Sequence, residues 1–411
     1  MSEVAYTPQL RFPEFHDNWN PTIFGKYVEK HKGGASLKPK DFVKKSTCEV
    51  IPKKAIQSGG LLALDEDNPT YCSEVFFGDN LRNVVDSSYL ITTLRDLVPS
   101  GPSIGYIVRN HISNPLILAQ GVYGFILKSG IDKEFLIQLS NRVDYRRLMQ
   151  KIMVGSTQVH IRTQDFFGIS LNLPTLSEQQ KIAAFLTAVD NKIEQLIKKQ
   201  ELLGEYKKGV MQQIFSQAIR FKADDGSTFP EWKEKKLGDI VRFENGKGHE
   251  QNISKDGKFI VVNSKFISSQ GRVKKYTDTQ KSPLNFGDVV MVMSDVPNGK
   301  ALAKCYYIEQ DNLYSLNQRI CGLKHKLADT KFIYYRINRH KYFLSFDSGV
   351  GQTNLKKMEI LNCPLNIPTD IKEQAKIANF LSSVDNKIEQ MGKQLDESKQ
   401  FKKALLQQMF V

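Results

Sequence analysis

The sequence predicts an α+β protein: two strand-rich domains lie in tandem, each is followed by a long helix, and the two helices pair as an antiparallel coiled coil. Three observations support this prediction. One long segment occurs twice almost unchanged, apolar residues in both copies have coiled-coil spacing, and the stretches between them consist of short β-branched and aromatic runs. A chain of 411 residues also exceeds what one ordinary hydrophobic core covers, so more than one domain is expected.

The internal repeat sets the predicted domain boundaries. The segment EQQKIAAFLTAVDNKIEQ, which starts at Glu178, returns as EQAKIANFLSSVDNKIEQ, which starts at Glu373. Weaker similarities precede each copy: Leu171-Asn172-Leu173-Pro174 with Leu365-Asn366-Ile367-Pro368, Gly155 and Gln158 with Gly349 and Gln352, and Phe12-Pro13-Glu14 and Trp19 with Phe229-Pro230-Glu231 and Trp232. We therefore expect a first domain over residues 1–176, a central spacer helix over 177–222, a second domain over 223–371 and a C-terminal spacer helix over 372–411.

Apolar residues in both helical segments recur at steps of four and three, which is the spacing of a coiled-coil seam. The predicted seam consists of Ile182, Leu186, Val189, Ile193, Leu196, Leu203, Val210 and Ile214 in the first copy and Ile377, Leu381, Val384, Ile388, Met391, Leu395, Leu405 and Met409 in the second. The two helices are expected to pack on each other, although an apolar stripe against a domain surface would have the same spacing. An antiparallel pair is expected because one domain joins the helices and domain ends usually emerge close together.

Further apolar side chains lie beside the seam, in numbers that a two-helix pair cannot bury. They include Phe185, Ile197, Leu202, Phe380 and Leu406. This surplus predicts either a further helical partner or packing against the chain's own domains.

The two domains are predicted to be rich in strands. Short runs such as FIVVNSKFI from Phe259 and DVVMVM from Asp288 combine β-branched and aromatic residues, and Gly, Asn, Asp and Pro separate them. Outside the matching positions the two domains differ strongly, whereas their helices stay alike. One scaffold that carries two different surfaces is typical of recognition of two different targets.

The charge of the chain favours a polyanionic partner such as nucleic acid, although a merely basic protein would share it. Lys and Arg number 58 against 44 Asp and Glu, a formal net charge of +14. Basic and amide side chains neutralise phosphates or pair with base edges. The candidates are Arg142, Arg146, Arg147, Lys151, Gln158, His160 and Arg162 in the first domain and Lys265, Arg272, Lys274, Lys275, Arg319, Gln352, Asn354, Lys356 and Lys357 in the second. For any single member, a solvated surface charge is the alternative interpretation.

The cysteines and the hydropathy pattern indicate a cytoplasmic protein with no membrane partner. Five cysteines lie far apart and form no C-x-x-C pair, which predicts neither a zinc site nor disulfides. No signal-peptide pattern opens the chain, and no stretch is long and apolar enough to suggest a membrane span.

Motifs of catalysis are missing from the sequence. The nearest approach to the N-P-P-F loop of an adenine methyltransferase is Asn20-Pro21-Thr22-Ile23, which does not match. No G-x-x-x-x-G-K-[ST] phosphate loop or H-E-x-x-H zinc motif occurs, and turn chemistry explains the acidic run Asp65-Glu66-Asp67 beside Asn68-Pro69. We therefore expect no catalytic residue, no metal and no cofactor on this chain.

With its paired L-N-x-P, E-Q-x-K-I-A-x-F-L and V-D-N-K-I-E-Q segments, the chain resembles the specificity subunits of type I restriction-modification systems over nearly its full length. The resemblance implies that each domain is a target-recognition domain that reads one half of a bipartite site in double-stranded DNA. It also implies that the helices dock two methyltransferase subunits and that nuclease-translocase subunits complete the complex. S-adenosylmethionine, ATP and Mg would then belong to these partner chains.

Two other functions remain as alternatives. A self-contained DNA-modifying enzyme would need catalytic motifs that the sequence lacks. A structural coiled-coil protein would leave two large basic domains unexplained.

Overall fold

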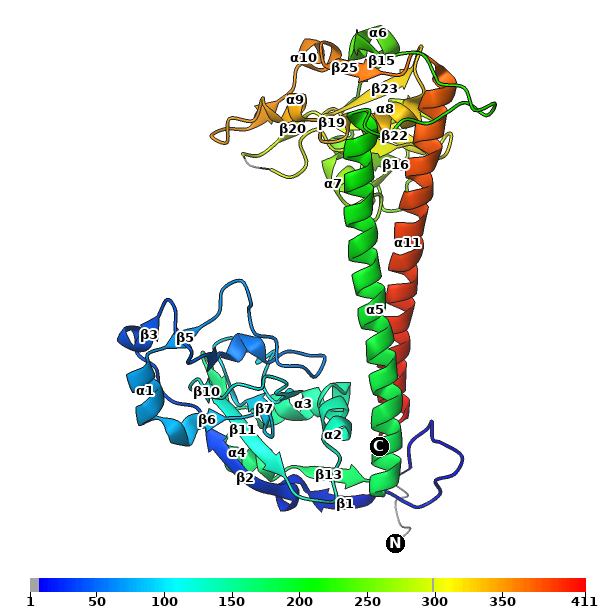
Figure 1. Cartoon of the computed structure of the whole chain (residues 1–411). Coiled ribbons are helices and arrows are strands. Elements are labelled where there is room, and N and C mark those ends of the chain that lie inside the picture. The colour runs from blue at the N-terminus through cyan, green and yellow to red at the C-terminus, as the bar shows by residue number, and fades with distance from the viewer. Residues whose placement is uncertain (1–6, 298) are drawn as a thin grey trace. The chain divides into compact units, whose positions relative to one another are not determined.

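The computed structural model describes residues 7–297 and 299–411, so the predicted start of the first domain, residue 1, lies outside the described residues. The chain forms two compact units (Figure 1). The first comprises residues 1–199 and 391–411, and the second comprises residues 200–390. Each unit contains one strand-rich domain and a part of both long helices, and this arrangement confirms the predicted fold class.

The first domain is built on a four-stranded antiparallel sheet whose strands follow the order β2-β11-β7-β9. Its strands are β1 (Asn20–Ile23), β2 (Val28–Gly33), β3 (Phe42–Val43), β4 (Val50–Ile51), β5 (Tyr71–Cys72), β6 (Val84–Val85), β7 (Leu90–Thr93), β8 (Arg95–Asp96), β9 (Ile107–Arg109), β10 (Leu116–Leu118), β11 (Val122–Leu127), β12 (Val159–His160) and β13 (Ser170–Leu173). Its helices are α1 (Glu74–Asp79), α2 (Lys133–Ser140), α3 (Val143–Ile152) and α4 (Thr163–Phe167), with 3-10 turns η1 (Phe24–Tyr27), η2 (Pro39–Asp41), η3 (Lys53–Ala55) and η4 (Leu81–Asn83).

The second domain repeats this plan on the sheet β15-β23-β19-β21. Its strands are β14 (Lys233–Lys236), β15 (Val241–Asn245), β16 (Phe259–Val262), β17 (Tyr276–Thr277), β18 (Pro283–Leu284), β19 (Val289–Val292), β20 (Ser294–Asp295), β21 (Cys305–Tyr307), β22 (Tyr314–Leu316), β23 (Ile320–His325), β24 (Thr353–Asn354) and β25 (Pro364–Ile367). Its helices are α6 (Leu237–Ile240), α7 (Ser264–Ser268), α8 (Thr330–Ile337), α9 (Lys341–Leu344) and α10 (Lys357–Leu361), with one 3-10 turn η5 (Glu250–Asn252).

The two domains agree in detail as well as in order. A second sheet in each is organised around one parallel pair, β4 with β10 and β16 with β22, and an antiparallel pair, β1 with β13 and β14 with β25, closes each domain. The methyltransferase-like run Asn20-Pro21-Thr22-Ile23 is therefore a strand of a closing pair rather than a catalytic loop. The run FIVVNSKFI is not one strand, because the side chain of Asn263 accepts a hydrogen bond from the amide of Phe266 and so begins helix α7.

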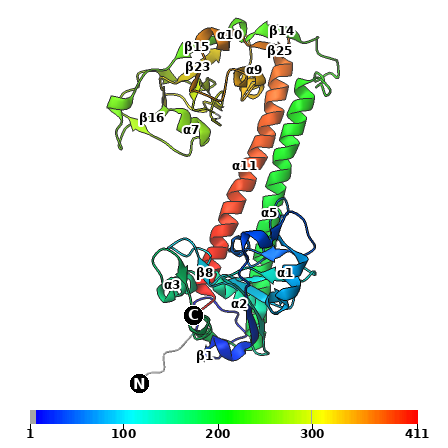
Figure 2. The same cartoon turned by 90° about the vertical axis from the view of Figure 1, so that its left-hand side faces the viewer.

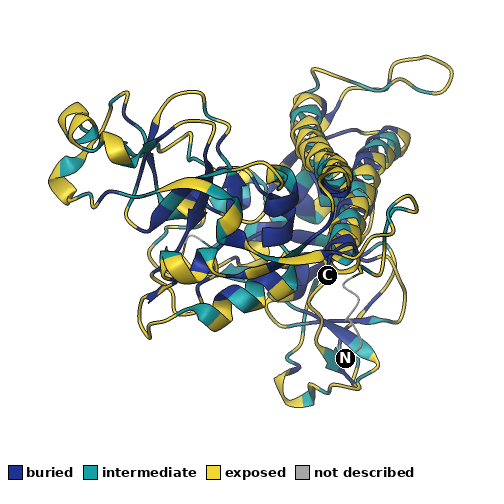
Figure 3. Ribbon diagram, turned by 90° about the horizontal axis from the view of Figure 1, so that it is seen from below, coloured by how far each residue is buried: buried dark blue, intermediate teal, exposed yellow. Residues whose placement is uncertain are grey.

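Large aromatic side chains lie in the core of the first domain among aliphatic ones. Trp19, Phe24, Phe125, Phe135 and Phe166 are all fully buried in one cluster. Each such burial contributes about 1.5–3 kcal/mol, so this cluster is a major source of stability. Figure 3 shows buried residues inside each domain, whereas the loops and the outer turns of the helices are largely exposed.

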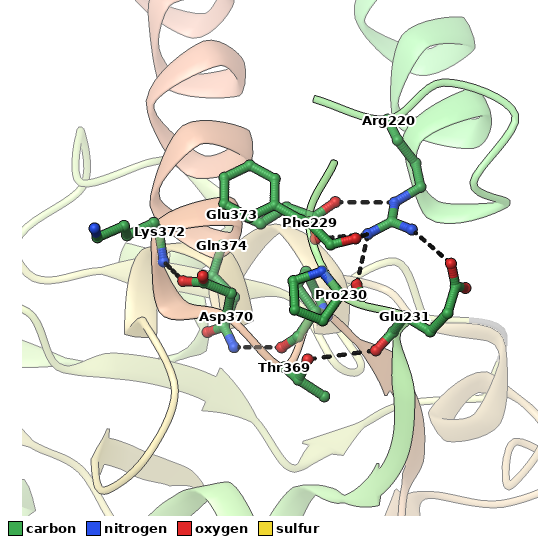
Figure 4. A network of polar contacts seen from close by, with 10 residues as sticks. Arg220, Phe229, Pro230, Glu231, Thr369, Asp370, Lys372, Glu373 and Gln374 are labelled. Carbon is green, nitrogen blue, oxygen red and sulfur yellow. Dashed lines mark hydrogen bonds and ion pairs between the residues drawn. The ribbon is translucent and has the colours of Figure 1, made fainter. Parts of the chain in front are cut away.

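The repeated Glu-Gln pair ties each long helix to its own domain, and Figure 4 shows the pair of the second unit. In the second unit the guanidinium of Arg220 lies 3.0 Å from the carboxylate of Glu373, which is completely buried. Gln374 accepts a hydrogen bond from the amide of Asp329 and donates one to the carbonyl of Pro368. The first unit repeats these contacts with Arg11, Glu178 and Gln179.

These contacts also correct the predicted alignment of the two domain starts. Phe12 packs against Phe185, and Phe221 packs against Phe380, which is the equivalent of Phe185. The structural counterpart of Phe12 is therefore Phe221 and not Phe229.

The long helices α5 (Leu176–Phe215) and α11 (Ile371–Gln408) lie side by side in each unit (Figures 1 and 2). Asp190 pairs with Lys402 at 2.5 Å in the first unit, and Lys207 pairs with Asp385 at 2.5 Å in the second. From the first ion pair to the second, the residue number increases on α5 and decreases on α11, so the two helices are antiparallel. All sixteen predicted seam residues are buried or half-buried.

Both helices end at matching contacts. Gln217 adopts a left-handed φ of 62°, so α5 ends at Phe215 and the last part of the predicted spacer, residues 216–222, follows it as a connection. The amide of Ile219 then bonds to the carbonyl of Gln213 at 3.2 Å, and in the first unit the amide of Leu10 bonds to the carbonyl of Gln408 at 2.8 Å.

All five cysteines are free and buried. Within residues 7–297 and 299–411, none of the helices combines the length and the apolar character that crossing a membrane requires.

Candidate nucleic-acid interface

A two-stranded ladder occurs at the same place in both domains. In the first, β8 pairs with β12 and places Arg95 opposite His160. In the second, β20 pairs with β24 and places Ser294 opposite Asn354. We call these ladders, with the residues that contact them, the first corner and the second corner.

An aspartate holds the loop that leaves each corner. Asp96 accepts hydrogen bonds from the amide of Val98 and from the hydroxyl of Ser103. Burial alone would raise the pKa of Asp96, but these bonds outweigh burial and lower it, so the group stays charged. Asp295 accepts from the amides of Ala301 and Leu302 in the same way.

A glutamine spans each corner. Arg95 donates to Oε1 of Gln158 at 3.2 Å in the first corner. Gln352 donates to Oγ of Ser294 at 2.6 Å in the second. The aspartate and the glutamine are thus a common frame, while the side chains that they position differ.

A hollow of about 520 Å³ opens beside the first corner. Arg95, Gln120, Tyr123, His160 and Arg162 line its sides, and the backbone of Gly33, Gly34 and Gly121 lines the rest together with Leu94, Ile161 and Thr163. A Cβ on Gly34 would overlap the carbonyl of Ala119, so only glycine permits this close approach of two strands. The hollow therefore presents hydrogen-bonding and positively charged groups on a tightly constrained backbone.

The positive charge extends beyond the hollow. Lys53 lies nearby, and its pKa is lowered mainly by burial and secondly by the positive charge of Arg95. Such a cluster of cationic and amide groups suits phosphates and base edges. In the part of the chain that the structure describes, no three His, Cys, Asp or Glu side chains gather as a metal-binding group.

Two of the predicted DNA contacts are taken up by interactions inside the first unit. Arg142 donates to the carbonyl of Val411 at 2.6 Å and lies over the ring of Phe410. Arg146 stacks on Tyr106 at 3.8 Å and donates to the carbonyl of Pro102. Burial lowers the pKa of both arginines. Their sequence positions among basic residues did not reveal this burial.

The other predicted candidates of the first domain are exposed. Arg147 and Lys151 lie on α3, whereas Gln158, His160 and Arg162 gather at the first corner. These last three remain the candidates that the fold brings together.

The nine candidates of the second domain are all exposed and form smaller groups. Lys265 lies on α7, and Arg272, Lys274 and Lys275 follow that helix. Gln352 and Asn354 belong to the second corner, and the carbonyl of Arg319 accepts from the amide of Met293 beside it. The remaining two, Lys356 and Lys357, follow β24, and Lys357 lies over the ring of Phe243.

Sequence reasoning missed Arg95 altogether. A signal existed, because Asp96 followed by Pro99 and Gly101 resembles Asp295 followed by Pro297 and Gly299. Aligning the two copies on these residues would have matched Arg95 with Ser294, each directly before the shared aspartate.

Comparison with known proteins identifies the kind of domain. Residues 32–203 and 230–399 each match the type I restriction modification DNA specificity domain. The MjaVIII specificity subunit of a type I restriction enzyme from Methanocaldococcus jannaschii is 27% identical over 276 residues, which cover 61% of this chain and 64% of that one. The MjaIX specificity subunit from the same organism is 27% identical over 186 residues, 42% of this chain and 43% of that one. The matched length is thus under two-thirds of either relative.

Solved structures share the fold. The S subunit of a type I restriction-modification system from M. genitalium aligns with a TM-score of 0.60 at 16% identity, over 98% of this chain and 99% of that one. A chain from a structural study of complex assembly and conformational transition of the type I R-M system aligns with a TM-score of 0.55 at 14% identity, over 96% and 97%.

Proposed function

Because this chain belongs to the type I restriction-modification DNA specificity family, we propose that it selects the DNA target of a methylation and restriction complex. Each domain reads one half of a bipartite site in double-stranded DNA. The observation that carries this proposal is the pair of corners: one frame of aspartate and glutamine holds Arg95 and His160 in one domain and Ser294 and Asn354 in the other. Different polar groups on the same frame suit two different half-sites.

The chemistry is assigned to partner chains. We propose that methyltransferase subunits bind S-adenosylmethionine and that nuclease-translocase subunits use ATP and Mg. The present chain would contribute binding and orientation of the DNA. Its lack of methyltransferase and phosphate-loop motifs supports this division.

The long helices offer two equivalent places for a methyltransferase partner. Tyr206 on α5 and Phe401 on α11 occupy matching positions of the repeat, and 51% and 54% of their surfaces are exposed. Ile197 and Leu202 are exposed beside the seam as well, whereas Leu406 is buried in the first core and Phe380 is half-buried. Exposed aromatic side chains on a helix face are typical anchors of a protein interface. Because the duplication supplies each anchor twice, two copies of one partner are expected.

Domain exchange tests the proposal. Residues 20–176 would be replaced by the matching domain of a related chain, and methylated adenines would be mapped in cells that also produce the methyltransferase subunits of this system. We expect one half of the methylated sequence to change and the other half to persist. If both halves changed, or if no defined sequence were methylated by the unaltered chain, the proposal would be wrong.

A further inference from the structure

We propose that a single arginine at each corner, Arg95 in the first domain and Arg319 in the second, recognises a guanine in the half-site that its domain reads. This inference rests on the proposed function and names the base contact within it. Three features of the corners support it.

The first feature is the equivalence of the positions. The amide of Leu94 bonds to the carbonyl of Gly121 at 2.9 Å, and the amide of Met293 bonds to the carbonyl of Arg319 at 3.1 Å. Gly121 and Arg319 therefore hold the same place, next to Arg95 and to Ser294 respectively.

The second feature is that the large and the small residue change places between the two corners: Gly121 lies beside Arg95, whereas Arg319 lies beside Ser294. Gly121 has a φ of +88°, and a Cβ on it would lie 2.8 Å from the Cβ of Arg95, so the arginine stem packs where a larger residue would collide. In the second corner the small Ser294 takes the place of Arg95, and the arginine comes from the other strand as Arg319. Each corner thus carries one arginine, at one or the other of these two neighbouring positions.

The third feature is the way in which Arg95 is held. Its stem is half-buried, one guanidinium nitrogen is bound to Gln158, and the side chain lines the hollow with Gln120 and His160. A planar guanidinium held in place can form two parallel hydrogen bonds to O6 and N7 of guanine, which is the commonest specific contact in the major groove. A phosphate contact needs only a positive charge, and flexible exposed lysines such as Lys274 and Lys275 meet that need.

Arg319 carries the same planar guanidinium as Arg95, but no described side chain of its own domain holds it. In the described ranges, 7–297 and 299–411, no hydrogen bond or ion pair involves its side chain, and the side chain is exposed. The amide of Gln352 nearby is occupied by Ser294 and Asn354, whereas the guanidinium of Arg319 stays available to a ligand.

The test exchanges the residues between the corners. R95S gives the first domain the serine of the second, and R319G gives the second domain the glycine of the first. Each variant is produced as the full chain with the methyltransferase subunits of its system. Methylated adenines are mapped in cells, and the purified complexes are titrated with duplexes in which one G·C pair of the mapped target is replaced.

We expect R95S to lose discrimination at one G·C pair of one half-site, by about 5-fold to 150-fold, and R319G to do so only in the other half-site. R95K keeps the charge but not the fork, so it should lose the same discrimination while its salt dependence stays unchanged. R82S is the matched control, because Arg82 is an exposed arginine of the same domain that does not line the hollow, and it should keep the full target.

Two results would overturn the inference. One is a half-site without any G·C pair. The other is an R95S complex that weakens equally on all duplexes with a salt slope smaller by about 0.9, which would mark a phosphate contact. If the unaltered complex recognised no sequence, the proposed function itself would fail, so the two failures are distinguishable.

Discussion

Loss of Arg220 should destabilise the second unit far more than loss of its partner Glu373. The carboxylate of Glu373 is completely buried, whereas 23% of the Arg220 side chain is exposed. Removing the arginine in R220M leaves a buried charge without a counter-charge, which costs about 3–5 kcal/mol. In E373Q the arginine keeps the carbonyls of Phe229 and Pro230 and reaches water, so the loss should be only about 1–2 kcal/mol.

The double variant sharpens the prediction. R220M/E373Q contains no buried charge, so it should be more stable than R220M alone, although it carries one more substitution.

Each unit contains one tryptophan, so its unfolding can be followed alone. The chain has two, Trp19 in the first unit and Trp232 in the second, and both are buried. In a W19F background, urea unfolding followed by the fluorescence of Trp232 measures the second unit, and R11M serves as a control that should leave this transition unchanged. Equal losses of unfolding free energy for R220M and E373Q, or a double variant no more stable than R220M, would refute the reasoning.

Two further predictions concern partners. F401S and Y206S should each reduce the number of methyltransferase subunits per chain from two to one, as measured by native mass spectrometry. The control K403S, which replaces an exposed charged neighbour of Phe401, should keep both subunits. If F401S and Y206S also kept two subunits, these aromatic side chains would not belong to the docking surface. Neutralising Lys274 and Lys275 together should weaken binding to all duplexes. The slope of log affinity against log salt concentration should fall by about 0.9 for each phosphate that is no longer neutralised. An unchanged slope would place these lysines away from the DNA.

The parts of the fold that the sequence predicted are those with a regular period or an internal copy. The seam could be identified because helices place every third or fourth residue on one face, and the duplication presented the same spacing twice. The antiparallel pairing, visible in the bonds of Asp190 to Lys402 and of Lys207 to Asp385, followed from a single connecting domain. The run FIVVNSKFI was harder, because a strand and a one-turn helix share it and only the cap at Asn263 separates them.

The site was predicted less well because burial and cross-strand register leave no local trace in a sequence. Arg142 and Arg146 look like a basic cluster, yet one holds the C-terminal residue and the other stacks on Tyr106. Arg95 looks isolated, yet pairing of β8 with β12 brings it opposite His160, far along the chain. Position in a sheet, rather than local composition, decides which of these cations reaches the hollow.

Comparison of the two copies separates structural residues from candidate reading residues. Residues that are identical in both, such as Asp96 with Asp295 and Gln158 with Gln352, make bonds inside their own domain. Residues that differ on the same frame, such as His160 and Asn354, are exposed. An aspartate such as Asp96, which holds an amide and a hydroxyl of its own domain, must stay when the target changes, because its loss would leave those groups without their acceptor. A side chain whose partner lies outside the protein can change together with that partner, so the differing positions of the two corners are where the two half-sites should be distinguished.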